Sequence, residues 1–355
     1  MRITFVISTI ERGGGAEKVC AFLAGALQER GYRVSIQLLM KSNKLNYPVK
    51  DGVNILPPPC FRFGIYGAIV HFLIRCFLHR NFPDCVISFL EPANVFAAIL
   101  ARFTGVRTIL TERANPKIGP RDPRCIKRIR DNLSRIAKYV MQTERCAEKF
   151  HEYLPVKPEQ LVVIYNPVES HFSPDNSREG SNILLAVGRL YYQKGYNRML
   201  RIFAAIHPLF PEKKLIICGS GPEEWRLKAL AKKYSIEDSV FFPGNVKDPG
   251  EYCRKAEVFL MTSHYEGMPN AMLEAYANGC PAISFDFDFG ASDIIKNEIN
   301  GLLIPQDDEK AFEKALIRYL KDPGLRDKFV RNIPQTLKKF SPEAIVTQWE
   351  QVIHG

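Results

Sequence analysis

The sequence predicts an α/β protein of two doubly wound units in tandem, each a parallel sheet with crossover helices. Residues 3–7 are rich in β-formers, glycines follow at 13–15, and apolar residues then recur at helical spacing over 16–27. The same order of strand, glycine and helix restarts at residues 182–187. A length of 355 residues suits two domains at roughly 100–200 residues each.

The remaining elements alternate in the same way. We expect further strands at residues 34–39, 86–89, 108–110, 139–141, 215–218, 240–242, 258–261 and 281–284, and helices at 94–103, at about 198–206 and ending near 234. A polar stretch at 173–181 separates the two series. We therefore assign residues 1–166, with a C-terminal helix of about 341–355 packing back on them, to one domain and 167–340 to the other. Two such units facing each other would form a ligand cleft beyond the carboxyl ends of their strands.

The net charge of +11 lies in the first half of the chain. Residues 1–170 hold 25 basic and 14 acidic side chains, whereas the rest hold 24 of each. The first half should therefore meet an anionic partner, which composition alone leaves open between a membrane surface, a phosphorylated substrate and nucleic acid.

Other global features favour a cytoplasmic protein. The apolar start lacks a signal-peptide cleavage site, and the longest charge-free apolar run in the basic half, 63–74, is shorter than the roughly 20 residues of a membrane span. The nine cysteines form no CxxC pair, which favours reduced thiols over a disulfide or zinc framework.

The strongest local signal is a pair of carboxylates, Glu266 and Glu274, on either side of a Gly-Met-Pro-Asn sequence. Pro269 suits the first turn of a helix, whose free N–H groups favour phosphate or sugar hydroxyls. Glu274 would meet another part of the same ligand. The alternative is an ordinary helix start with a solvated Glu274.

Two glycine loops carry weaker signals. After the strand at 182–187, Gly188 is followed by Arg189 and then Lys194, which could neutralise a diphosphate leaving group; the alternative is a basic surface loop. Gly14 and Gly15 precede a helix and would let a ligand approach closely. They match neither GxGxxG nor the P-loop pattern, so a flexible turn is the alternative.

Together these motifs resemble the retaining glycosyltransferases of family 4, which have the GT-B fold of two Rossmann-like domains facing across a cleft. The resemblance spans nearly the whole chain and is densest from 182 to about 305, which includes EGMPNAMLEA, GSGP and NGLLIP. It implies sugar transfer from a nucleotide sugar with retention, by front-face attack in which the leaving phosphate helps to deprotonate the acceptor. It implies neither a metal nor a cofactor, the nucleotide sugar being a substrate.

The resemblance also implies residue roles. Arg189 and Lys194 would bind the nucleotide diphosphate and Glu266 the transferred sugar, and we assign these three as catalytic. The other implied donor contacts are Glu274 at the ribose hydroxyls, Gly14 and Gly15 at the diphosphate, Gly219 in the GSGP turn, Val246 along the base, and the amides at Met268, Pro269 and Asn270 at sugar hydroxyls or phosphate.

One position departs from the common family pattern. Arg113 stands where many relatives have a histidine near the sugar. A subset resembling capsule and O-antigen transferases also has arginine at this position. It would add a cation near the phosphates. Asp286 and Asp288 have the letters of a DxD motif, but they follow a predicted strand and we assign them to a loop rather than to a metal.

The basic half points to a membrane. Residues 121–138 are basic with apolar residues at near-helical spacing, and 61–82 interleave aromatic and aliphatic residues with Arg62, Arg75 and Arg80. We expect an interfacial surface that meets anionic lipid and the acceptor; a packed helix with a solvated charged face is the alternative. Its principal cations would be Arg124, Lys127, Arg128 and Arg130.

We therefore expect a peripheral enzyme of the inner face of the cytoplasmic membrane that builds a bacterial surface glycan on a polyprenyl-pyrophosphate-linked saccharide. Residues 88–94 resemble the same region of transferases that add N-acetylgalactosamine to bacterial glycans, which favours a UDP-hexosamine or UDP-hexose donor. The alternatives are a GT-B enzyme with a soluble acceptor, such as a sucrose-type synthase, a UDP-sugar epimerase, or a nucleic-acid-binding protein, for which no recognition motif is present.

Overall fold

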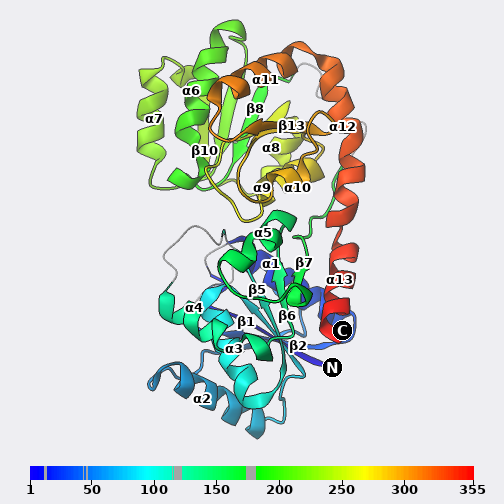
Figure 1. Cartoon of the computed structure of the whole chain (residues 1–355). Helices are drawn as coiled ribbons and strands as arrows, with labels where there is room; N and C mark the ends of the chain where they lie inside the picture. The colour runs from blue at the N-terminus through cyan, green and yellow to red at the C-terminus, as the bar shows by residue number, and fades with distance from the viewer. Residues whose placement is uncertain (12–13, 43, 45–46, 114, 116–121, 173–180) are drawn as a thin grey trace. The chain divides into compact units, whose positions relative to one another are not determined.

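The protein is described by a computed structural model that covers residues 1–355 except 12–13, 43, 45–46, 114, 116–121 and 173–180 (Figure 1). The chain divides into two compact units, residues 1–166 with 343–355 and residues 167–342.

The first unit is built on a seven-stranded, wholly parallel sheet. Its strand order is β3 (Asn54–Leu56), β2 (Arg33–Leu38), β1 (Arg2–Ile7), β4 (Cys85–Phe89), β5 (Arg107–Thr111), β6 (Lys138–Met141) and β7 (Leu161–Val163). Its helices are α1 (Gly15–Glu29), α2 (Gly64–Leu78), α3 (Glu91–Thr104), α4 (Pro123–Arg130), α5 (Glu144–Lys149) and α13 (Pro342–His354). The order reverses between β1 and β4, and ligands of open α/β sheets bind at the carboxyl end of such a reversal.

The second unit repeats this plan with six parallel strands. The order is β10 (Val240–Gly244), β9 (Lys214–Cys218), β8 (Ile183–Val187), β11 (Val258–Met261), β12 (Ala282–Asp286) and β13 (Gly301–Pro305). The helices are α6 (Tyr196–Ile206), α7 (Glu224–Lys233), α8 (Pro249–Lys255), α9 (Asn270–Ala277), α10 (Ala291–Ile294), α11 (Glu309–Lys321) and α12 (Pro323–Leu337). Here the reversal falls between β8 and β11.

The last helix, α13, belongs to the core of the first unit. Trp349, Ile345 and Ile353 are fully buried in the same cluster as the central strands. Arg30 at the end of α1 pairs with Glu343 at 2.6 Å and with Glu350. Residues from the far end of the sequence therefore complete the hydrophobic core that β1 begins.

The predicted α/β class and every predicted strand are present. Three strands, β3, β7 and β13, were not predicted. The expected helical pattern over residues 121–138 is wrong beyond Arg130, where α4 ends. A 3₁₀ turn over Leu133–Arg135 follows, and Lys138 begins β6, so the later apolar residues are spaced for packing rather than for one long helix.

Candidate active site

A buried ion pair joins the loops that follow β8 and β11 at the reversal of the second sheet. Lys194 Nζ lies 2.7 Å from Glu266 Oε1, and the two side chains are only 16% and 8% exposed. Ser263 Oγ donates to the same oxygen at 2.7 Å, and Gln193 Nε2 donates to Glu266 Oε2 at 3.1 Å. Three donors therefore hold the carboxylate, and the sequence prediction that Lys194 and Glu266 serve one site acquires a geometric basis.

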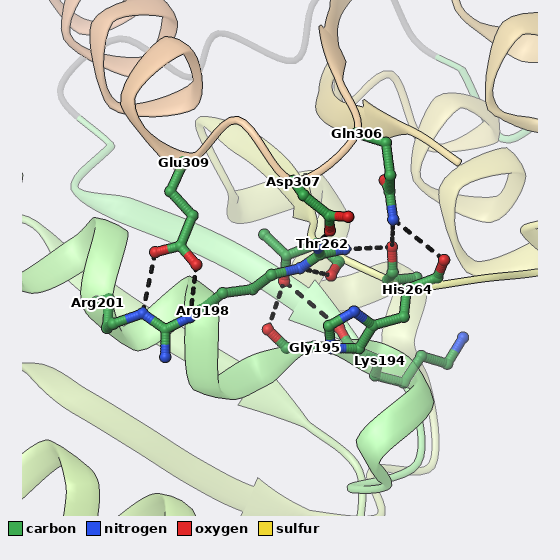
Figure 2. A network of polar contacts seen from close by, with 10 residues as sticks. Lys194, Gly195, Arg198, Arg201, Thr262, His264, Gln306, Asp307 and Glu309 are labelled. Atoms are coloured by element: carbon green, nitrogen blue, oxygen red, sulfur yellow. Dashed lines mark hydrogen bonds and ion pairs between the residues drawn. The ribbon is translucent and has the colours of Figure 1, made fainter. Parts of the chain in front are cut away.

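Arg198 of α6 binds Thr262, in the turn that follows β11, and Asp307 (Figure 2). Its guanidinium, in a side chain only 2% exposed, donates to the carbonyls of Thr262 and Ser263 and pairs with Asp307. It also lies over the Phe285 ring, 4.2 Å from the centroid. Burial lowers the pKa of Arg198, and Asp307 opposes that shift. Backbone carbonyls at the carboxyl end of β11 are thus held by a desolvated cation.

Gly195 lets the two loops approach. A Cβ at this position would lie 2.0 Å from the Thr262 carbonyl oxygen, and its φ of +62° disfavours other residues. Thr262 Oγ1 returns a hydrogen bond to the Gly195 carbonyl at 3.0 Å (Figure 2). The glycine that follows Lys194 is therefore required by close packing.

The other predicted donor residues of the second unit lie on loops and helices that follow its strands. Arg189, directly after β8, is exposed, lies 5.3 Å from the Tyr191 ring centroid and has no ion pair in the described part of the chain. Glu274 is half-buried in the second turn of α9. Gly219 follows β9, where a Cβ would lie 2.0 Å from the Gly188 carbonyl oxygen. Val246 lies farther along the sheet edge, in the loop between β10 and α8.

The predicted cluster of ligand-binding amides at the start of α9 needs correction. Pro269 has no N–H to offer, and the Asn270 N–H donates to the Met268 carbonyl at 2.9 Å. Of these three positions, only the Met268 N–H has no acceptor among the described residues. Of the amides predicted to bind a ligand around these three positions, the Asn270 N–H is thus used within the turn and the Met268 N–H remains.

At the first helix of the first unit, the predicted anion site already holds a carboxylate. The Gly14 N–H donates to Glu17 Oε2 at 3.0 Å in a capping arrangement, and Glu17 is buried. Gly15 begins α1 and is exposed. Gly13 lies outside the described residues.

Arg113 is a buried cation of the first unit. Its Nη1 donates to Asn166 Oδ1 at 2.7 Å, and its guanidinium lies 4.9 Å from the Phe89 ring centroid and 5.8 Å from that of Trp349. Burial lowers the pKa of Arg113 to about 10, so the group stays charged at neutral pH. Among the residues that the structure describes, its Nε and Nη2 have no hydrogen-bond partner, which leaves three N–H bonds for an anion.

The basic helix α4 exposes all four predicted cations. Arg124 forms an ion pair with Asp122, the N-cap residue of α4, at 2.9 Å. Lys127, Arg128 and Arg130 make no ion pair with any other residue that the structure describes. Arg121 lies outside the described residues.

Helix α2 exposes an apolar stripe. Phe63 and Phe77, at its two ends, are 79% and 82% exposed, and Tyr66, Val70 and Ile74 lie between them at spacings of three or four residues. Arg75 does not belong to this surface as predicted, because it donates to Gln37 Oε1 and to the Pro57 carbonyl. An exposed apolar stripe of this length marks a contact surface.

Two searches of the described residues gave no site. None of their helices is both long and apolar enough to span a bilayer. They also contain no group of three or more His, Cys, Asp or Glu side chains arranged to hold a metal ion.

Sequence reasoning missed Arg198, Ser263 and Gln193. The signal for Arg198 was present, since it is the one charged residue among the apolar residues on the buried face of α6. Ser263 and Gln193 carried no signal, because their role depends on where the two loops meet.

Comparison with known proteins defines the class. The profile described as "Glycosyl transferases group 1" matches residues 168–336, and that described as "Glycosyltransferase Family 4" matches residues 13–172. The lipopolysaccharide outer core galactosyltransferase WaaB in its apo form covers 100% of the chain and is itself covered to 99%, at TM-score 0.80 and 20% identity. Anabaena HepE in complex with UDP gives full coverage of both chains, TM-score 0.83 and 16% identity. The fold is GT-B, and the protein is a glycosyltransferase.

Closer relatives give the family. A Campylobacter jejuni enzyme named as a GalNAc-α-(1→4)-GalNAc-α-(1→3)-diNAcBac-PP-undecaprenol α-1,4-N-acetyl-D-galactosaminyltransferase is 30% identical, over 99% of this chain and 98% of that protein. The amylovoran biosynthesis glycosyltransferase AmsD of Erwinia amylovora is 28% identical over 99% of both. The chain belongs to glycosyltransferase family 4.

The two arginines of α6 in Figure 2 provide a matched test of the buried network. We expect Arg198→Met to lower the free energy of unfolding by about 3 kcal/mol, because two buried carbonyls lose their donor. Arg201→Met breaks only a more exposed pair with Glu309 (2.9 Å) and should cost less than about 1 kcal/mol. Urea unfolding followed by circular dichroism measures both, and equal losses would show that burial of Arg198 is not what matters.

Proposed function

We propose that the enzyme transfers a sugar, with retention and without a metal, from a UDP-sugar to a lipid-linked saccharide of a bacterial surface glycan. The observation that carries the donor half is the Lys194–Glu266 pair at the reversal of the second sheet, with the exposed Arg189 on the same loop as Lys194. Two cations and a fixed carboxylate there suit a sugar diphosphate. A UDP donor is supported by HepE, whose structure holds UDP.

The residues would divide the work as follows. The acceptor hydroxyl oxygen bonds to the anomeric carbon on the face from which the diphosphate leaves, the bond between that carbon and the β-phosphate oxygen breaks, and the hydroxyl proton passes to the departing phosphate. Arg189 and Lys194 stabilise the charge that develops on the diphosphate. Glu266, held by Ser263 and Gln193, accepts hydrogen bonds from the transferred sugar. Glu274 holds the ribose, and Arg113 offers to phosphate the N–H bonds of Nε and Nη2, which no described residue accepts.

The acceptor half rests on the first unit. Its α4 cations and the apolar stripe of α2 suit an anionic bilayer surface, at which a polyprenyl-diphosphate saccharide is anchored. The Campylobacter relative is named for such an acceptor. We place the enzyme at the inner face of the cytoplasmic membrane.

A panel of nucleotide sugars tests the donor. UDP-sugars and UDP should raise the melting temperature by about 5–10 °C at a hundredfold excess over Kd, because only the native state binds them. GDP- and ADP-sugars at the same concentrations are the comparison. Equal stabilisation by all three bases, or by none, would contradict a UDP donor.

Substitution of the buried pair tests the chemistry. Lys194→Met and Glu266→Gln should each lower kcat roughly 100-fold or more, because each removes a charge placed for the transition state. Lys228→Met removes a surface lysine paired with Glu224 and should leave kcat unchanged. Release of labelled sugar from a UDP-sugar measures turnover, and near-normal kcat in either site variant refutes its assigned role.

Vesicle binding tests the membrane surface. Lys127→Glu with Arg130→Glu should weaken binding to phosphatidylglycerol-containing vesicles roughly 30-fold, at about 1 kcal/mol per basic residue near the surface. Lys232→Glu with Lys233→Glu makes the same charge change on α7 of the second unit, where both lysines are exposed. Co-sedimentation that is equal for both double variants would exclude α4 as the contact.

A further inference from the structure

The first unit contains an apolar cavity that no step above uses. Its volume is about 350 Å³, within the roughly 300–1,000 Å³ of small-ligand sites. Ser8 directly follows β1, Leu39 and Met40 follow β2, and Pro92 lies in the first turn of α3, after β4. The cavity therefore lies at the carboxyl ends of the strands where the first sheet reverses, the place at which open α/β sheets bind ligands.

The lining selects for hydrocarbon. Ile65 of α2, Val95 of α3 and Cys125 of α4 close the cavity together with the residues that follow the strands. Ser8 and Arg128 are the only hydroxyl and charged residues among the lining side chains. A cavity with so few polar groups gives water little to bond to and takes apolar ligands.

One end of the lining is cationic. Arg128 is exposed and has no ion pair with any described residue, and Lys127 and Arg130 flank it on the same short helix. An apolar cavity next to an unpaired guanidinium suits an amphiphile whose anionic group is attached directly to a hydrocarbon chain.

The exposed stripe of α2 supplies a route for such a chain. Ile65 lines the cavity, while Tyr66, the next residue, belongs to the stripe. Helix α3 packs against both α2 and α4, so stripe, cavity and cations belong to one layer of the unit. A chain lying on the stripe can therefore reach the cavity, and Arg128 lines the same cavity.

We infer that this cavity takes the end of the acceptor's polyprenyl chain next to its diphosphate, with Arg128 beside the phosphate groups. The inference rests on the proposed function and extends it: the enzyme recognises the lipid of its acceptor as well as the saccharide. Chain-bearing acceptors are thereby favoured over free sugars, and the saccharide is held at a fixed distance from the cavity.

The chain's own cysteines report on the cavity. Cys125 lines it and is partly exposed, Cys60 is exposed, and the other seven cysteines are buried. Burial raises the pKa of Cys125, so alkylation by N-ethylmaleimide is best followed at pH 8.5. Farnesyl diphosphate, as a short-chain probe, should slow alkylation of Cys125 roughly tenfold at ten times its Kd and leave Cys60 unaffected. Inorganic pyrophosphate should protect neither.

Two variants separate the chain from the charge. Ile65→Trp fills the cavity and should abolish protection, whereas Ile74→Trp adds the same ring to the exposed stripe and should preserve it. Arg128→Gln leaves the cavity open, so it should weaken protection by farnesyl diphosphate but not by farnesol. Three outcomes would overturn the inference. They are protection by pyrophosphate alone, full protection in Ile65→Trp, and stronger protection by dodecyl phosphate, which has an unbranched chain, than by farnesyl diphosphate.

A transfer assay distinguishes this inference from the proposed function. Two acceptors are compared, which have the same saccharide diphosphate but only one of which carries a prenyl chain. Ile65→Trp should raise the KM only for the acceptor that carries the chain. An equal KM for both acceptors in the wild type contradicts the inference while transfer itself stands. If the wild type transfers no sugar, the proposed function fails, and Cys125 protection still decides whether the cavity binds the chain.

Discussion

The second unit depends on one buried guanidinium. Arg198 lies on α6, the helix that follows the Lys194 loop, and it binds the two carbonyls that end β11. A cation removed from water is stable only where acceptors surround it. Helix α6 and the turn after β11 must therefore pack so that the guanidinium reaches both carbonyls. The location of Ser263, and through it of Glu266, follows from that requirement.

The positions of the charged groups of the site depend on this packing. Lys194 and Glu266 come from different loops, and both side chains are largely buried. A small displacement of either loop would leave a buried charge without its partner. Gly195 allows the two loops to pack closely because it has no side chain, and any side chain there would separate them. A catalytic pair positioned in this way needs no rearrangement of its own when substrate charge develops.

The sequence predicted those parts of the molecule that depend on local pattern. The central strands carry continuous apolar runs and were recognised, whereas β3 is short and largely exposed and β7 is only half-buried, so neither carries a buried-strand pattern. Lys194 and Glu266 stood out as local motifs, and the resemblance to glycosyltransferase family 4 implied their roles. Arg198 and the apolar cavity were not predicted, because each exists only where segments far apart in sequence meet. The amides at Pro269 and Asn270 were overvalued, since spacing does not reveal that a turn uses its own donors.

The return of α13 to the first unit sets an order on biosynthesis. The ribosome delivers residues 1–166 before residues 167–342, yet Trp349, which belongs to the core of the first unit, is made only after the second unit. The second unit has all its strands in one continuous segment and can close its core while the first still lacks a helix. The first unit is therefore completed after the second, and its apolar core must wait until α13 has been translated.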